Sequence, residues 1–110
     1  MLPYEIAPRA LQSFLKNTEN TSFVLLDVRE PWEFEIAHID GSVSMPMGDI
    51  PSRAHAELDP DARMIAVCHH GVRSLQVATW LRNQDFEHVQ SLAGGLEAWA
   101  AEIDPAMPRY

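Results

Sequence analysis

The sequence is poor in cysteine and has no long apolar run. Among its 110 residues Cys68 is the only cysteine, so no internal disulfide can form. This usage fits a reducing compartment and leaves a thiol free for packing or for chemistry. The first residues lack the basic start and apolar stretch of a signal peptide, and no later run approaches the length of a membrane span. We therefore expect a soluble cytoplasmic protein.

Positive charge is also scarce. Eight basic residues, of which only Lys16 is a lysine, stand against 16 acidic residues, and the formal net charge is −8. Such a chain is repelled by phosphate backbones and by anionic membrane surfaces, so we expect neither nucleic acid nor membrane as a partner. An anionic substrate would need a local pocket of backbone N–H groups and arginines.

Length and composition fit one compact domain. A chain of 110 residues with 46% hydrophobic residues can bury one core and leaves no room for a second. It has no repeats, no low-complexity tracts and no blocks of like charge. We expect a single domain over residues 1–110, with its core at about 6–103 and a terminal tail at 104–110.

Strand-like and helix-like patterns alternate along the chain. Strands are expected at residues 23–26, 43–45, 64–67 and 86–92, and helices at residues 8–15, 31–34, 74–83 and 96–101. Polar residues 16–21 end the first helix, while Pro46, Gly48 and Pro51 indicate a loop. The alternation predicts an α/β fold, a parallel central sheet flanked by helices on both faces. Sites in such sheets form beyond the carboxyl ends of the strands.

The segment between the run at 64–67 and the next helix carries the chemistry. It reads Cys68, His69, His70, Gly71, Val72, Arg73, Ser74. A loop that curls over a helix N-terminus aims backbone N–H groups inward and favours an anion, and Gly71 allows the tight curl. A cysteine at its base is expected to be a thiolate nucleophile that needs no dedicated base. Arg73, and His69 or His70 when protonated, would strengthen this.

Two other interpretations of these residues are weaker. A lone cysteine at a strand end is commonly a small buried hydrophobe, but the glycine, arginine and paired histidines after Cys68 serve no packing purpose. A metal site shared by Cys68, His69 and His70 is disfavoured because three adjacent ligands from one tight loop rarely converge on one ion. We expect no metal and no organic cofactor.

The motif Cys68-x-x-Gly71-x-Arg73-Ser74 closely resembles the active-site loop of rhodanese domains. In that family the cysteine accepts sulfane sulfur and the loop amides hold the persulfide. The resemblance extends to residues 27–46, which look like the first signature of the family, and to 86–99, which look like its last. It covers most of the chain in the order of the family and implies the rhodanese-like fold.

The chain departs from the family pattern at two positions. Asp85 stands where glycine is common, and Ser42 stands where alanine is frequent. Aspartate tolerates a positive φ better than most residues, so a turn that ends a helix is still expected at Asp85. The serine is a small change, and neither departure touches the loop.

The resemblance implies a role for each residue of the site. Cys68 is the catalytic residue. The substrate-binding residues are His69, His70, Gly71, Val72, Arg73, Ser74 and Arg29. Arg29 is included because its counterpart in the family lies near the active-site mouth, where it would help to hold an anionic donor. A structural ion pair involving Asp27 or Arg29 is the alternative.

The implied activity is that of a thiosulfate sulfurtransferase. A persulfide on Cys68 would carry sulfur from thiosulfate or another small anionic donor to a thiol, cyanide or protein acceptor. A sulfur relay between proteins is an equally open alternative, and the retained Cys68 counts against a module that only binds a partner. Cysteine-dependent phosphatases and arsenate reductases of related fold use a longer loop between cysteine and arginine. The shorter spacing from Cys68 to Arg73 therefore disfavours these activities. The sequence leaves donor, acceptor, pathway and oligomeric state open.

Overall fold

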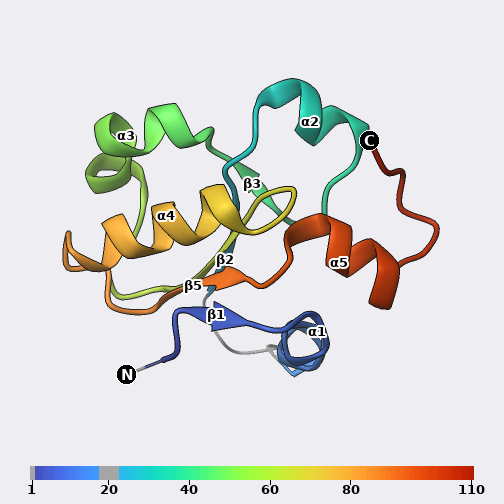
Figure 1. Ribbon diagram of the computed structural model, residues 1–110. Coiled ribbons are helices and arrows are strands. Elements are labelled where there is room, and N and C mark those ends of the chain that lie inside the picture. The colour runs from blue at the N-terminus through green and yellow to red at the C-terminus, as the bar shows by residue number, and fades with distance from the viewer. Residues whose placement is uncertain (1, 18–22) are drawn as a thin grey trace.

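The computed structural model describes residues 2–17 and 23–110, which form a five-stranded parallel sheet with helices on both faces (Figure 1). The strands are β1 (Glu5–Ile6), β2 (Phe23–Asp27), β3 (Val43–Ser44), β4 (Arg63–Val67) and β5 (Val89–Leu92). The helices are α1 (Pro8–Lys16), α2 (Pro31–Ile36), α3 (Ile50–Glu57), α4 (Val72–Arg82) and α5 (Gly95–Glu102), with a 3-10 turn at Met47–Asp49. The predicted α/β fold is confirmed.

The sheet places the end of β4 beside the end of β2. The strand order is β1-β5-β4-β2-β3, and β2 pairs with β4 from Phe23 opposite Arg63 to Asp27 opposite Val67. One further bond from the Val28 N–H to the Val67 carbonyl oxygen (2.9 Å) extends the ladder. Cys68 therefore leaves the carboxyl edge of the sheet at a central position, next to the segment that follows β2.

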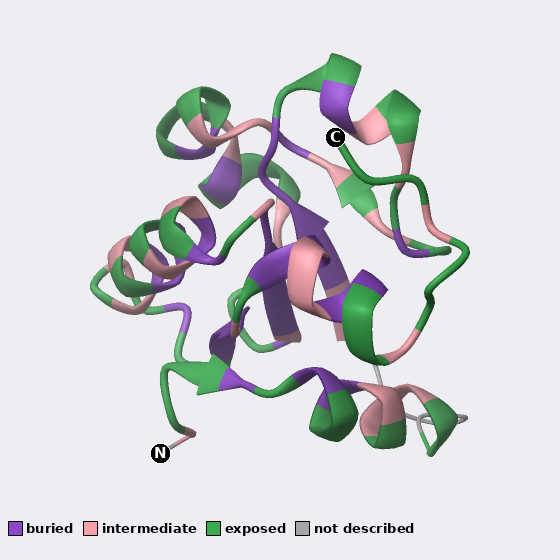
Figure 2. Ribbon diagram, turned by 45° about the vertical axis from the view of Figure 1, so that its right-hand side comes forward, coloured by how far each residue is buried: buried purple, intermediate pink, exposed green. Residues whose placement is uncertain are grey.

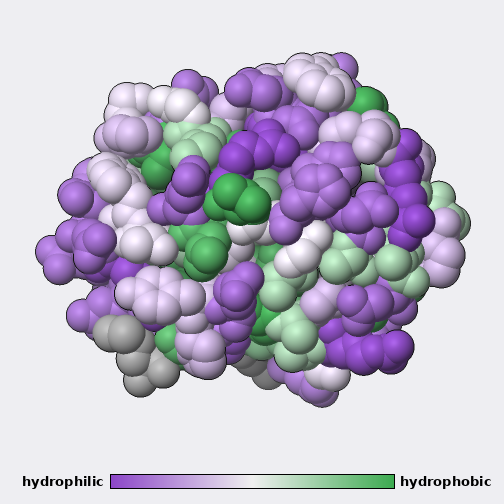
Figure 3. Space-filling view, in the orientation of Figure 1, coloured by the Kyte–Doolittle hydropathy of each residue, from purple (hydrophilic) through white to green (hydrophobic). Residues whose placement is uncertain are grey.

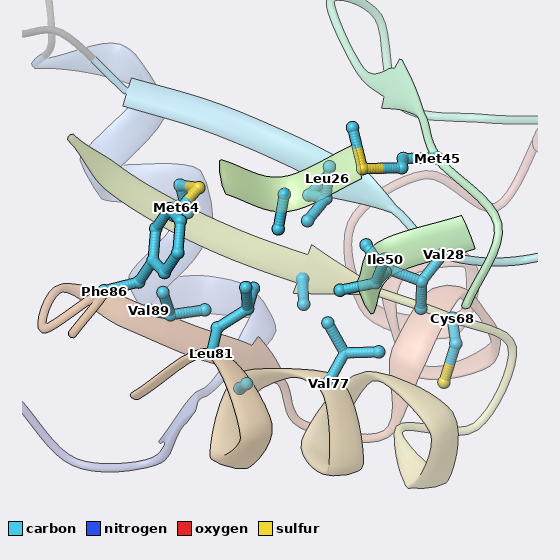
Figure 4. Close-up of a cluster of buried hydrophobic side chains, with 13 residues drawn as sticks. Leu26, Val28, Met45, Ile50, Met64, Cys68, Val77, Leu81, Phe86 and Val89 are labelled. Atoms are coloured by element: carbon cyan, nitrogen blue, oxygen red, sulfur yellow. The ribbon is translucent and has the colours of Figure 1, made fainter. Parts of the chain in front are cut away.

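Each face of the sheet buries its own apolar cluster, and Figure 2 shows the buried strands between half-buried helices. One cluster joins the sheet to α3 and α4 through Met64, Ile50, Val77, Leu81 and Phe86 (Figure 4). The other joins it to α1 and α5 through Leu11, Leu25, Ile65, Leu92 and Trp99. Burying a side chain such as leucine contributes about 1.5–3 kcal/mol, so the two clusters hold the strand ends in place.

Proline marks where two of the helices begin. Pro8 and Pro31 open α1 and α2, where a missing N–H costs nothing. Asp85 has φ of 70°, which confirms the positive φ expected there. The predicted break at 16–21 falls largely outside the described residues.

The structure corrects three details of the sequence interpretation. Residues 50–57 form α3, because Pro51 lies in the first turn of a helix and does not interrupt it. The two-residue β1 is too short for a sequence pattern to reveal. The strand expected at 86–92 begins only at Val89, and Phe86 packs into the core ahead of it.

The segment 104–110 is more than a tail. After α5 it runs back along the molecule and ends beside α2, as Figure 1 shows. Met107 packs against the apolar cluster that includes Trp99. None of the helices in the described parts of the chain has the length and apolar character needed to span a bilayer.

Candidate active site

The loop between β4 and α4 is built around Cys68. Figure 4 shows Cys68 at the end of the apolar cluster, with its sulfur directed toward the first turn of α4. Gly71 precedes α4 and has φ of 97°, a left-handed conformation that side-chain-bearing residues rarely adopt. A side chain at Gly71 would also approach the backbone nitrogen of Gly94 to 3.1 Å. The tight curl expected from the sequence is present.

Polar hydrogens converge on the buried sulfur. Cys68 is 1% exposed, and its Sγ accepts hydrogen bonds from the backbone N–H groups of Gly71 (3.1 Å) and Ser74 (3.3 Å). The Ser74 hydroxyl lies 3.3 Å from the same sulfur and 2.7 Å from the hydroxyl of Ser91 on β5. Inward N–H groups at a helix start stabilise negative charge. The cradle therefore suits a sulfur that becomes an anion or a persulfide.

The start of α5 orients the peptide groups of the loop. The N–H groups of Leu96 and Glu97 donate to the carbonyl oxygens of Cys68 (2.9 Å) and His69 (3.0 Å). Because those carbonyls point outward to α5, the N–H groups of the loop can point to its other side, where the Cys68 sulfur lies. Gly95 makes this approach possible, since a Cβ there would lie 2.4 Å from the His69 carbonyl oxygen. The turn at Gly94 and Gly95, where α5 begins, thus supports the cysteine loop directly.

The outer residues of the loop form one side of the mouth. The rings of His69 and His70 stack with centroids 4.1 Å apart, and His69 Nε2 lies 3.6 Å from a carboxylate oxygen of Glu97. Val72 is 66% exposed. The face seen in Figure 3 carries hydrophobic and hydrophilic residues side by side. The exposed Val72 and the Glu97 carboxylate give this side of the mouth both an apolar and a charged contact.

An ion pair closes the other side of the mouth. The Arg73 guanidinium donates to both carboxylate oxygens of Glu33 on α2, at 2.7 and 3.0 Å. The Arg73 side chain is partly exposed, whereas that of Glu33 is buried. Hydrogen bonds, chiefly from Arg73 and to a lesser extent from Tyr110 and the Glu30 N–H, lower the pKa of Glu33 from 4.5 to about 2, and Glu33 in turn raises the pKa of Arg73. Charge on Cys68 adds to the rise, so Arg73 lies within electrostatic reach of the sulfur.

Arg29 lies behind this rim with every donor occupied. Its Nε and Nη2 bind the two carboxylate oxygens of Asp27 at 2.9 and 2.7 Å. The remaining N–H groups reach the carbonyl oxygens of Glu33 and Ala37 and the hydroxyl of Tyr110. A guanidinium has five N–H donors, and all five have acceptors here. Arg29 is 0% exposed, and its contacts are those of the structural ion pair that was the alternative for this residue. A role of Arg29 in holding an anionic donor stays a prediction.

Sequence reasoning missed three residues of this site. Ser91 reads as one position of a strand, and Glu33 stands in the first signature without a role assigned to it. Tyr110 lies in a segment interpreted as a tail, and no local pattern marks it.

Among the described residues, no group of three or more histidine, cysteine, aspartate or glutamate side chains could hold a metal ion.

Taken together, fold and loop define an α/β domain whose single cysteine is buried beneath backbone N–H groups at the start of α4. The sequence matches the Rhodanese-like domain family over residues 10–102. Because this match covers most of the chain, the protein belongs to the rhodanese-like domain family. The rhodanese resemblance of the loop and its flanking signatures is confirmed.

Similar proteins include sulfurtransferases. The chain is 39% identical to the thiosulfate sulfurtransferase GlpE of Stutzerimonas stutzeri, over 73% of this chain and 72% of that protein. It is 33% identical to the putative sulfur carrier protein YrkF of Bacillus subtilis, over 86% of this chain and 51% of that protein. The solution structure of the rhodanese-like domain of the Alr3790 protein from Anabaena sp. superposes with a TM-score of 0.82 at 29% identity, covering 99% and 86% of the two chains. The chain spans only 26–30% of the length of several other curated relatives.

Proposed function

We propose that the protein transfers sulfane sulfur through a persulfide on Cys68. The observation that carries this proposal is the set of N–H groups from Gly71 and Ser74 on the buried sulfur. Such a cradle stabilises charge on the sulfur without a partner base. The membership of the rhodanese-like family and the similarity to GlpE support sulfur as the transferred atom.

The first half-reaction loads the cysteine. The Cys68 thiolate attacks the outer sulfur of thiosulfate or of another persulfide donor, and a new sulfur–sulfur bond forms as the old one breaks. With thiosulfate, sulfite leaves with the bonding electron pair. The loop N–H groups hold the terminal sulfur, and Arg73 at the mouth favours the approach of an anion.

The second half-reaction unloads it. A thiolate or cyanide attacks the terminal sulfur of the persulfide, and Cys68 leaves as a thiolate. The products are a new persulfide or thiocyanate, with no net oxidation or reduction of the protein. The cycle needs no metal or organic cofactor.

A relay between proteins is the second candidate. Val72 and Trp32 are 66% and 58% exposed near the loop and α2, an apolar surface that a small anion does not need. The similarity to a putative sulfur carrier protein points the same way. In this version the chemistry at Cys68 is unchanged, and the donor or acceptor is the cysteine of a protein partner.

Intact mass measurement tests the proposal. The protein is incubated with excess thiosulfate, freed of small molecules and weighed before and after cyanide, with Cys68→Ser as the control. We expect a gain of one sulfur atom that requires Cys68 and disappears with cyanide. If only a persulfide or protein donor loads Cys68, the relay is favoured. If no donor loads it, the sulfurtransferase function is wrong.

A further inference from the structure

The segment 104–110 brings Tyr110 to the mouth of the site. Met107, Pro108, Arg109 and Tyr110 line a small hollow together with Ala37, His69, Leu96 and Glu97. Arg109 Nε lies 3.6 Å from a carboxylate oxygen of Glu97. The segment thus connects α5, the cysteine loop and the end of α2, and it delivers one aromatic side chain between them.

The hydroxyl group of Tyr110 bridges two charged residues. It accepts a hydrogen bond from Arg29 Nη1 (2.8 Å) and donates one to Glu33 Oε2 (2.7 Å). Partial burial of its hydroxyl group is the main cause that raises the pKa of Tyr110, so the phenol keeps the proton that it donates. Hydrogen bonds linked in this way polarise one another. Tyr110 therefore connects the buried Arg29 to the carboxylate that holds Arg73.

The ring of Tyr110 contacts the loop as well. Its centroid lies 4.2 Å from that of His69 and 5.8 Å from that of Trp32. His69 stacks in turn on His70. One side chain thus contacts both sides of the mouth.

The carboxylate of Glu33 requires such a contact. Beside an anion cradle, an incompletely neutralised carboxylate would repel an anionic substrate. Glu33 Oε2 accepts hydrogen bonds from both Arg73 Nη2 and Tyr110. Tyr110 on Oε2 and the backbone N–H of Glu30 on Oε1 (3.0 Å) hold the plane of the carboxylate, and that plane sets the direction of the Arg73 guanidinium.

We propose that Tyr110 is a positioning residue of this site, which orients Arg73 through Glu33 so that anionic reagents are favoured at Cys68. The proposal rests on the proposed function, since it concerns the approach of an anionic sulfur donor. Tyr110 does not touch the sulfur in this arrangement and acts through its neighbours.

Alkylation of Cys68 by two reagents of similar size tests the proposal without sulfur transfer. Iodoacetate is an anion and iodoacetamide is neutral, so the ratio of their rates measures how strongly the mouth favours an anion. We expect Tyr110→Phe, which removes only the hydroxyl group, to lower this ratio about threefold, the effect of one modest hydrogen bond. Tyr4→Phe is the matched control, because Tyr4 is also exposed and lies against Arg82 away from the site.

The same rate ratio, measured in an Arg73→Ala background, shows whether Tyr110 acts through Arg73. If Tyr110 acts through Glu33 and Arg73, Tyr110→Phe has no further effect once Arg73 is removed. An unchanged ratio in Tyr110→Phe alone, or an equal fall in both backgrounds, overturns the proposal. With thiosulfate, we expect a higher KM and a limiting rate within about twofold of wild type. A further outcome is that the expected fall in the iodoacetate-to-iodoacetamide rate ratio occurs and yet the protein takes no sulfur from any donor. That result would overturn the proposed function and leave the positioning role of Tyr110 intact.

Discussion

Asp27 and Arg29 form a buried bidentate ion pair, with both carboxylate oxygens within 2.9 Å of the guanidinium. Neither side chain is more than 1% exposed. The pair joins the end of β2 to the start and end of α2 and to Tyr110, so it supports the rim that carries Glu33.

Removing Arg29 is expected to destabilise the protein. Arg29→Ala leaves the Asp27 carboxylate buried without its partner, which costs about 3–5 kcal/mol. Urea unfolding of the variant measures the loss. Arg53→Ala is the control, since Arg53 forms exposed pairs with Glu57 and Asp49, and little change is expected there. A stable Arg29→Ala protein with a raised KM for thiosulfate would instead restore Arg29 as a donor-binding residue.

Acid is expected to weaken the fold through Glu33. Its pKa falls from 4.5 to about 2 in the folded protein, chiefly because of Arg73. A lowered folded pKa gives stability that is present above pH 4.5 and lost as the pH falls toward 2. The contribution is at most on the order of 3 kcal/mol.

Thermal unfolding of wild type and Glu33→Gln between neutral pH and pH 2 measures this contribution. We expect the difference between the two proteins to shrink as the pH falls. The control is Glu57→Gln, whose exposed carboxylate pairs with Arg53, and here little difference is expected at any pH. A Glu33 difference that stays constant with pH would show that the carboxylate is not the cause.

Loss of the Ser74 hydroxyl is expected to slow persulfide formation without abolishing it. Ser74→Ala removes the Oγ contact with Cys68 and leaves Ser91 without this partner, while the Ser74 N–H still donates to the sulfur. Ser74 Oγ accepts a hydrogen bond from the Cys68 S–H in this structure and can donate its own hydrogen once the thiolate forms. We expect about a tenfold lower single-turnover rate, the effect of one hydrogen bond to a charged group. Ser52→Ala, which removes an exposed hydroxyl bonded to the Asp49 carbonyl oxygen, should react at the wild-type rate.

A methyl group at Gly95 is expected to disturb the cysteine loop. Gly95 has φ of 62°, and an added Cβ would lie 2.4–2.5 Å from the carbonyl oxygens of His69 and Cys68. The strained φ alone costs about 1–3 kcal/mol, and the loop must also move. Gly95→Ala should therefore lower both the melting temperature and the rate of Cys68 alkylation. At Gly48 an added Cβ meets nothing within 4 Å, so Gly48→Ala should change neither.

The fold could be predicted where its residues signal it locally. The runs at 23–26 and 64–67 are apolar throughout because both faces of these parallel strands are buried. The region around α3 could not be predicted in the same way, since Gly48 and Pro51 also occur in loops. The position of Pro51 within the first turn is settled by the packing of Ile50 and Ala54 on the sheet.

The candidate site also has a part that could be predicted from the sequence and a part that could not. Residues 68–74 are contiguous, so one motif reveals the cysteine, the turn and the start of α4. Their partners come from distant parts of the chain: Ser91 lies 17 residues from Ser74, and Glu33 lies 40 residues from Arg73. Arg29 and Tyr110 are 81 residues apart. Only the tertiary fold brings these pairs together, and a single sequence carries no mark of them.

The hydrogen bonds from Leu96 and Glu97 to the carbonyls of Cys68 and His69 affect when the cysteine loop takes its final shape during folding. As the chain emerges from the ribosome, Cys68 emerges about 30 residues ahead of these donors, since Glu97 lies 29 positions further along the chain. Until α5 docks, the carbonyls of Cys68 and His69 lack these two donors. The full set of contacts around Cys68 therefore forms only when α5 packs on the loop, and the reactivity of Cys68 reports on that packing.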